Sequence, residues 1–123
     1  MIRGSVNTMQ EATVRLRLRG PSGVEEDVVA VVDTGFDDRL SLPISMPAVL
    51  GLTLRSTSQA ILADGSVKWF EIFDAEVDWN GTWCPIQVSA IGDEVLVGMM
   101  LLKKHELRIE VVPGGAVEIT PLP

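Results

Sequence analysis

The stretch Val28-Val29-Ala30-Val31-Val32-Asp33-Thr34-Gly35 places an acid directly after five consecutive apolar residues. An apolar run of this length predicts a β-strand that is buried on both faces. A carboxylate at the end of such a strand loses hydration, which costs free energy unless a nearby group hydrogen-bonds it. Thr34 and Gly35 supply a hydroxyl, a tight turn and an accessible backbone N–H. The pattern therefore indicates that Asp33 is a carboxylate whose protonation is controlled.

Composition and charge indicate one folded, acidic domain over residues 1–123. Apolar residues make up 46% of the chain, enough for a sizeable hydrophobic core. The net charge of −7 and the lack of a basic cluster argue against nucleic acid or an anionic membrane as a partner. There is no signal-peptide pattern and no membrane-spanning stretch, and Cys84, the one cysteine, cannot form an internal disulfide. We therefore expect a cytoplasmic protein.

The chain reads as a succession of strands separated by turn signals, which predicts an all-β domain folded as a partly closed barrel. Val14, Leu16 and Leu18 alternate with arginines, as in a strand with one buried face. The predicted strands cover residues 14–18, 24–33, 40–43, 52–63, 67–77, 83–90, 95–97, 107–112 and 116–119.

Turns and helices complete this prediction. Asp64-Gly65 and Asn80-Gly81 are typical of hairpin turns. A brief helix is expected over residues 45–50, where Ser45 is suited to cap its start and the following glycine to end it. The strongest helix candidate covers residues 99–105, with His105 at its negative C-terminal end.

Three short motifs follow one another along this strand pattern. A buried strand ends in Asp33-Thr34-Gly35, a hairpin is tipped by Ala63-Asp64-Gly65-Ser66, and Leu96-Val97-Gly98 precedes the late helix. The separation is 31 positions from residue 33 to residue 64 and 65 positions from residue 33 to residue 98. This ordered set resembles the retropepsin-like aspartic proteases. Within that family, Asp33-Thr34-Gly35-Phe36 followed by Leu40-Ser41-Leu42-Pro43 most resembles the small bacterial members. The similarity extends from about residue 12 to residue 119 and implies a single retropepsin-like β-barrel domain.

The resemblance implies an aspartic endopeptidase that works as a homodimer. The two Asp33 carboxylates would share a proton and hold the water that attacks a peptide bond. Thr34 would bond across the two-fold axis, and the Gly35 N–H would hold the Asp33 carboxylate. Ala63-Asp64-Gly65-Ser66 would form a mobile flap over an extended peptide or protein substrate, and Leu96-Val97-Gly98 would form the structural floor. The resemblance implies no metal and no cofactor.

Phe36 stands where this family usually carries a small residue. It would lie beside the substrate, where its ring would crowd either the substrate pocket or the dimer axis, and it cannot hydrogen-bond the aspartate. This residue favours an alternative from another functional class, a catalytically inactive module of the same fold that binds peptides or dimerises. A third possibility is a proteolytic domain that matures one specific partner.

Simpler interpretations exist for several residues. Asp33 could cap an ordinary turn, or it could hold a cation together with Asp37 and Asp38, although the spacing of a calcium loop is absent. His105 is the only histidine, so one chain cannot form a two-histidine metal site. Cys84 has no nearby second cysteine and is expected to be an inert buried thiol.

Packing roles are expected for the chain ends and the tryptophans. Residues 1–10 and 116–119 are predicted to be exposed, as candidates for strand exchange between two copies. Trp69, Trp79 and Trp83 are expected in the core or at an interface.

Overall fold

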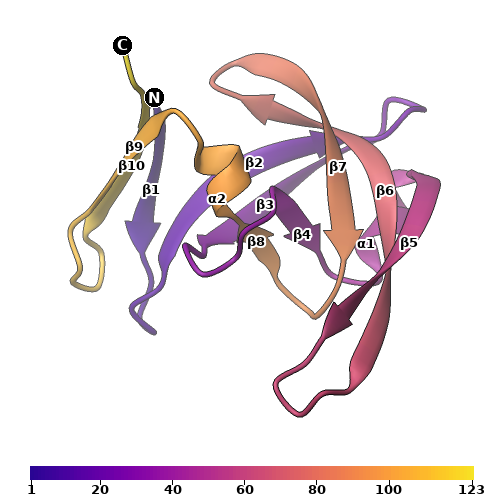
Figure 1. The fold of residues 1–123 in the computed structure, drawn as a ribbon. Coiled ribbons are helices and arrows are strands. Elements are labelled where there is room, and N and C mark those ends of the chain that lie inside the picture. Colours follow the sequence, from indigo (N-terminus) through magenta and orange to yellow (C-terminus); the bar gives the residue numbers. More distant parts are fainter.

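Alternating apolar side chains build one sheet of ten strands in this computed structural model, which describes residues 1–123 (Figure 1). Strands make up 56% of the chain and helices 7%, so the all-β prediction is confirmed. The strands are β1 (Ile2–Val6), β2 (Ala12–Arg19), β3 (Glu25–Val32), β4 (Leu40–Leu42), β5 (Thr53–Ile61), β6 (Val67–Trp79), β7 (Thr82–Ala90), β8 (Val95–Val97), β9 (His105–Ile109) and β10 (Ala116–Pro121). The helices are α1 (Met46–Leu50) and α2 (Met99–Leu102).

Six of these strands close into a barrel in the order β2, β3, β8, β4, β7 and β6. The barrel closes where β6 pairs with β2, with Leu18 opposite Val77 and Arg19 opposite Glu76. Two of its pairings are parallel, β3 with β8 and β4 with β7. The remaining strands extend the sheet outside the barrel: β5 continues beyond β6, and β1, β10 and β9 continue beyond β2.

The hydrophobic core fills the barrel because the strands alternate as the sequence predicts. Val14, Leu16 and Leu18 all point inward from β2 and are buried. They belong to one cluster of 20 buried residues that also includes Val77 of β6 and Val97 of β8. The arginines between the inward residues of β2 face outward, where Arg17 pairs with Asp27 at 2.8 Å.

The strand before Asp33 is buried on one face only, so the expectation of two buried faces is wrong. Val28 and Ala30 are buried, whereas the side chain of Val29 between them is 58% exposed. The reason is that β3 is a wall of the barrel, so its side chains alternate between the core and the outer surface. The apolar run thus provides both the core face and an exposed apolar surface that leads to Asp33.

The late helix is shorter than the sequence predicts. It ends at Leu102 rather than at residue 105, and Lys104 has a positive φ of 65°. His105 is instead the first residue of β9, which pairs antiparallel with β10. The end of the predicted helix therefore belongs to the sheet, because pairing of β9 with β10 begins at His105. By contrast, the brief helix α1 agrees with prediction and ends at left-handed Gly51, although the Ser45 side chain makes no capping bond. Neither helix is long and apolar enough to cross a membrane.

His105 has a packing role rather than the helix-end role expected for it. The Trp79 Nε1–H donates to His105 Nε2 at 3.2 Å, and the two rings meet edge to face. Of the tryptophans, Trp79 is buried as expected and Trp83 lies beneath the Arg19 guanidinium, but Trp69 is 64% exposed. Cys84, expected to be a buried thiol, is only partly buried, at the edge of the core.

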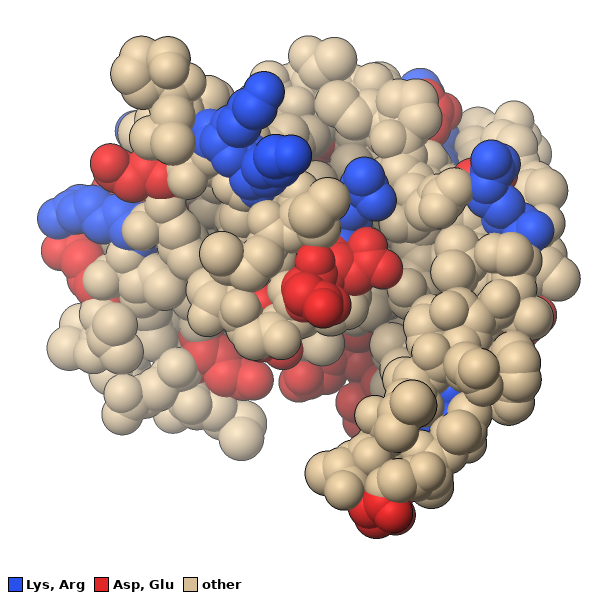
Figure 2. Space-filling view, viewed as in Figure 1, with Lys and Arg blue, Asp and Glu red and all other residues tan.

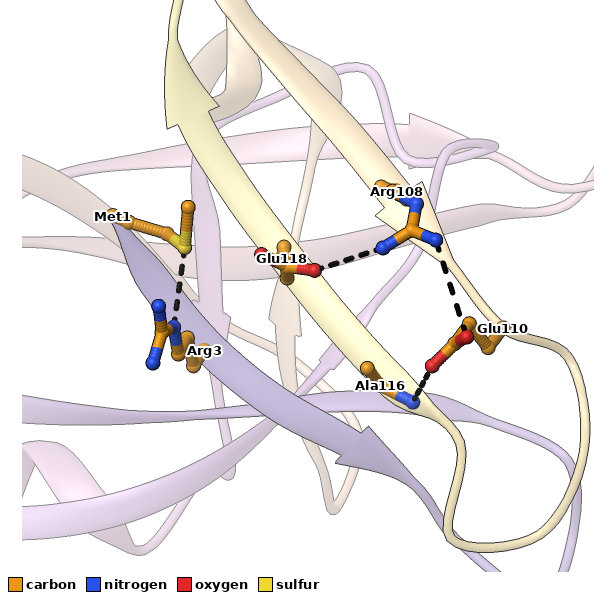
Figure 3. A network of polar contacts seen from close by, with 6 residues as sticks. All are labelled: Met1, Arg3, Arg108, Glu110, Ala116 and Glu118. Atoms are coloured by element: carbon orange, nitrogen blue, oxygen red, sulfur yellow. Dashed lines mark hydrogen bonds and ion pairs between the residues drawn. The ribbon is translucent and has the colours of Figure 1, made fainter.

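The chain ends are paired within the molecule rather than left as exposed arms. β1 lies between β2 and β10, and β10 lies between β1 and β9, which leaves β9 as the free edge. Figure 3 shows the surface of this part of the sheet, where Arg108 of β9 reaches Glu118 of β10 at 3.0 Å. Exposed ion pairs of this kind contribute little to the stability of the fold. The backbone ladders and the buried residues Ile2 and Ile119 therefore hold the ends in place.

We predict that Leu18→Ala lowers the free energy of unfolding by about 2–5 kcal/mol, because it leaves a cavity where the barrel closes. The same change at Leu122, whose side chain is 53% exposed, is the matched control and should alter stability by less than about 0.5 kcal/mol. Urea unfolding of both variants measures the difference. Equal losses for the two would contradict the assignment of Leu18 to the core.

Candidate active site

Asp33 is placed by the parallel pairing of β3 with β8. Val32 lies opposite Val97, and the Asp33 N–H continues the ladder by donating to the Val97 carbonyl oxygen at 2.9 Å. Parallel neighbours end at the same edge of a sheet. The Asp33 turn and Gly98 therefore meet, although 65 residues separate them in the chain.

The Asp33 carboxylate is oriented by its own turn. Its Oδ1 accepts a hydrogen bond from the Gly35 N–H at 2.9 Å. The Asp33 residue is half-buried, while Thr34 and Gly35 are exposed. No Lys, Arg or His forms an ion pair with Asp33. The structure thus presents an oriented carboxylate that is not neutralised by a cation and that is open to a reactant.

Gly98 allows the turn after Asp33 to pack tightly on β8. A Cβ at this position would overlap the Asp38 carbonyl oxygen and would lie 2.7 Å from the Phe36 ring. Hydrogen bonds fix the contact: the Gly98 N–H donates to the Arg39 carbonyl oxygen, and the Met99 N–H donates to the Phe36 carbonyl oxygen, both at 2.8 Å. The ring of Phe36 therefore lies against Gly98, which gives this bulky residue a supporting role in the loop.

The predicted flap is a hairpin of β5 and β6 that projects from the barrel (Figure 1). Its turn is closed by the Leu62 N–H, which donates to the Ser66 carbonyl oxygen at 2.8 Å, and Gly65 adopts a φ of +84°. The residues of the tip, Ala63 to Ser66, are all exposed. Figure 2 shows the projecting hairpin as largely uncharged, with acidic atoms at its end.

Asp64 organises the tip of this hairpin. Its Oδ1 accepts hydrogen bonds from the Ser66 hydroxyl at 2.6 Å and from the Ser66 N–H at 2.9 Å. These bonds, the hydroxyl bond first, lower the pKa of the Asp64 carboxyl below its ordinary value. The tip is therefore held most firmly when Asp64 is ionised.

The structure brings Asp33-Thr34-Gly35, Phe36 and Leu96-Val97-Gly98 together, but the flap tip does not line a common cavity with Asp33. The alternative of a cation site also finds no support, because no three His, Cys, Asp or Glu side chains gather as metal ligands. Asp38 instead accepts a hydrogen bond from the Arg39 N–H.

A groove beside Asp33 was not foreseen from the sequence. It has a volume of about 450 Å³ and runs from Asp33 and Thr34 past Val31 and Leu96. Its other walls come from Glu11 and Ala12 at the start of β2, Glu94 before β8, Ile109 at the end of β9 and Val111 just after that strand. Only tertiary packing joins these segments. The one local signal in the sequence is the alternation of apolar and polar residues over 107–112, which indicates a strand at the wall that contains Ile109 and Val111.

We predict that Gly98→Ala displaces the loop of residues 33–39 and destabilises the protein by about 1–3 kcal/mol or more, because the added methyl group has no space. Met99→Ala, at the exposed neighbouring position, is the control and should leave the loop in place. Limited proteolysis of the loop and thermal unfolding report both effects. An unchanged loop in the Gly98 variant would refute the close contact.

Acidification should loosen the flap tip. The folded-state pKa of Asp64 is lowered, so its stabilising contribution is present above the ordinary aspartate range and is lost as the pH falls through the lowered value. An NMR titration of the Asp64 carboxyl should give a midpoint below that of an unstructured aspartate, and Ser66→Ala should raise it. A midpoint that Ser66→Ala leaves unchanged would argue against the hydroxyl as the main cause.

Comparisons with models of protein families, with curated proteins and with solved structures find no match for this chain. The assignment of a function therefore depends on the residues and the geometry described above.

Proposed function

We propose that this chain is an aspartic endopeptidase that acts as a homodimer, with one Asp33 from each copy. The observation that carries the proposal is the oriented Asp33 carboxylate, held by the Gly35 N–H at the end of a barrel strand and left without a cationic partner. Each chain has one Asp-Thr-Gly turn. A pair of such carboxylates therefore requires a second copy across a two-fold axis.

The chemistry of such a pair follows from electrostatics. Two carboxylates about 3 Å apart repel by roughly 5 kcal/mol at an effective dielectric constant of 20, so they share one proton. The ionised Asp33 takes a proton from a bound water as the water oxygen attacks the peptide carbonyl carbon. The protonated Asp33 donates to the carbonyl oxygen and stabilises the tetrahedral intermediate. The C–N bond breaks when the leaving nitrogen receives the proton that the first Asp33 took from the water, and the other Asp33 regains its proton from a hydroxyl of the intermediate as the carbonyl re-forms.

The exposed apolar residues of the hairpin support its role as a flap. Trp69, Phe73 and Val77 share one face of β6, and their exposure falls from a mostly exposed tryptophan to a fully buried valine. Ile61, opposite Val67 near the tip, is 78% exposed. Exposed apolar surface of this kind suits a hairpin that closes over a peptide and excludes water.

A second candidate function is an inactive module that binds peptides without cutting them. Phe36 favours it, because the ring occupies the position after the glycine and cannot hydrogen-bond Asp33. Its contact with Gly98 provides a structural reason for the ring that does not require catalysis. The two candidates differ in one measurable property, the appearance of new peptide termini.

We predict that Asp33→Asn lowers cleavage of a diverse peptide mixture by at least about 10³-fold and leaves the fold intact. Asp37→Asn, an exposed acid in the same loop, is the matched control and should retain activity. Mass spectrometry of the products between about pH 3 and pH 7 measures cleavage, which should be fastest on the acid side because the pair must hold one proton.

Sedimentation at micromolar concentration should find a dimer. Cleavage by a monomer, or full cleavage by the Asp33 variant, would disprove the shared carboxylate pair. Peptide binding without new termini in the unmodified protein would instead support the inactive module.

A further inference from the structure

The groove beside Asp33 has apolar walls on two sides. Val31 and Leu96, cross-strand partners on the outer face of β3 and β8, form one wall. The other wall is formed by Ile109, the last residue of β9, and by Val111 just after it, which is 62% exposed. At about 450 Å³, the groove has room for a long side chain.

The ionisable residues that line this groove are all acids: Glu11, Asp33 and Glu94. Neither glutamate forms an ion pair with a Lys or Arg of the chain. The absence of basic residues is local, because a larger groove elsewhere is lined by three arginines (Arg3, Arg15 and Arg17) together with Asp27 and Asp78.

Glu11 is also held in position. Its Oε1 accepts a hydrogen bond from the Asn7 side-chain N–H at 3.0 Å, and its backbone N–H donates to Asn7 Oδ1 at 2.9 Å. Asn7 thereby fixes the turn between β1 and β2 against the groove. One carboxylate oxygen of Glu11 has no hydrogen-bond partner within the chain.

We infer that this groove is a substrate subsite that selects a lysine or arginine side chain of the peptide. The inference rests on the proposed function, because it is Asp33 that places the groove next to the scissile bond. The aliphatic stem of a lysine or arginine packs on Val31 and Leu96, and its charged end reaches Glu11 and Glu94. An acidic side chain in the same groove is repelled by both glutamates.

The test uses peptides that differ at one residue, which is lysine, norleucine or glutamate, with that residue placed at each position around the cleaved bond. At one position, we expect kcat/KM to rank lysine above norleucine and norleucine above glutamate. Glu94→Gln should lower the ratio of kcat/KM for the lysine peptide to kcat/KM for the norleucine peptide by about two- to fivefold, the range expected for one exposed charge pair. Glu11→Gln combined with Glu94→Gln should remove the preference, and added salt should weaken it.

Asp93→Asn is the matched control, since this exposed acid neighbours Glu94 in the chain but does not line the groove. It should leave both the activity and the ratio unchanged. Cleavage with no lysine preference at any position, or a preference that survives loss of both glutamates, would overturn the subsite and leave the role of Asp33 intact.

A binding measurement separates failure of the subsite from failure of the proposed function. Fluorescent peptides with lysine or glutamate at the chosen position are titrated into the Asp33→Asn protein. Tighter binding of the lysine peptide, which Glu94→Gln weakens and the combined Glu11→Gln and Glu94→Gln change abolishes, would support the subsite even if the unmodified protein cleaved nothing. Equal binding of the two peptides, or no binding, would overturn it.

Discussion

The parallel pairing of β3 with β8 is the constraint on which the candidate site depends. It aligns Val32 with Val97 and extends by one hydrogen bond, from the Asp33 N–H to the Val97 carbonyl oxygen. A parallel pair cannot be joined by a short turn, so the chain builds four strands and a helix between its two members. The position of Asp33 is therefore a property of the whole barrel rather than of the local turn.

The barrel and the β5–β6 hairpin are joined through β6, which belongs to both. This strand of 13 residues pairs with β7 over residues 71–79 and with β5 over residues 67–74. Its C-terminal part closes the barrel against β2, while its N-terminal part is the free hairpin. A register shift between Leu54 and Ser56 on β5 marks the region where the hairpin leaves the body. Where a strand carries a bulge it bends and twists, so a shift at this point of β5 changes the direction of the hairpin without interrupting β6.

Local patterns were enough to predict most strands and the two hairpin turns. The placing of Leu96-Val97-Gly98 beside the Asp33 turn was predicted only from the family resemblance. The predictions that failed concern features that depend on contacts between distant segments of the chain. The exposure of Val29 follows from barrel closure, and the place of His105 follows from pairing of β9 with β10. The groove beside Asp33 joins four segments, so no periodicity in one of them indicates it.

The bulky side chain of Phe36 is accommodated by the contact of its ring with Gly98. From the sequence alone, a phenylalanine after Asp-Thr-Gly is expected to crowd either the substrate pocket or the dimer axis. In the structure, its ring packs on Gly98, where any side chain would collide with the Asp38 carbonyl oxygen and with the ring itself. The absence of a Cβ at Gly98, directly after β8, therefore accommodates the large side chain on the loop. Since the same loop orients Asp33, the chemistry available to that carboxylate is set by β8 as much as by the turn that carries it.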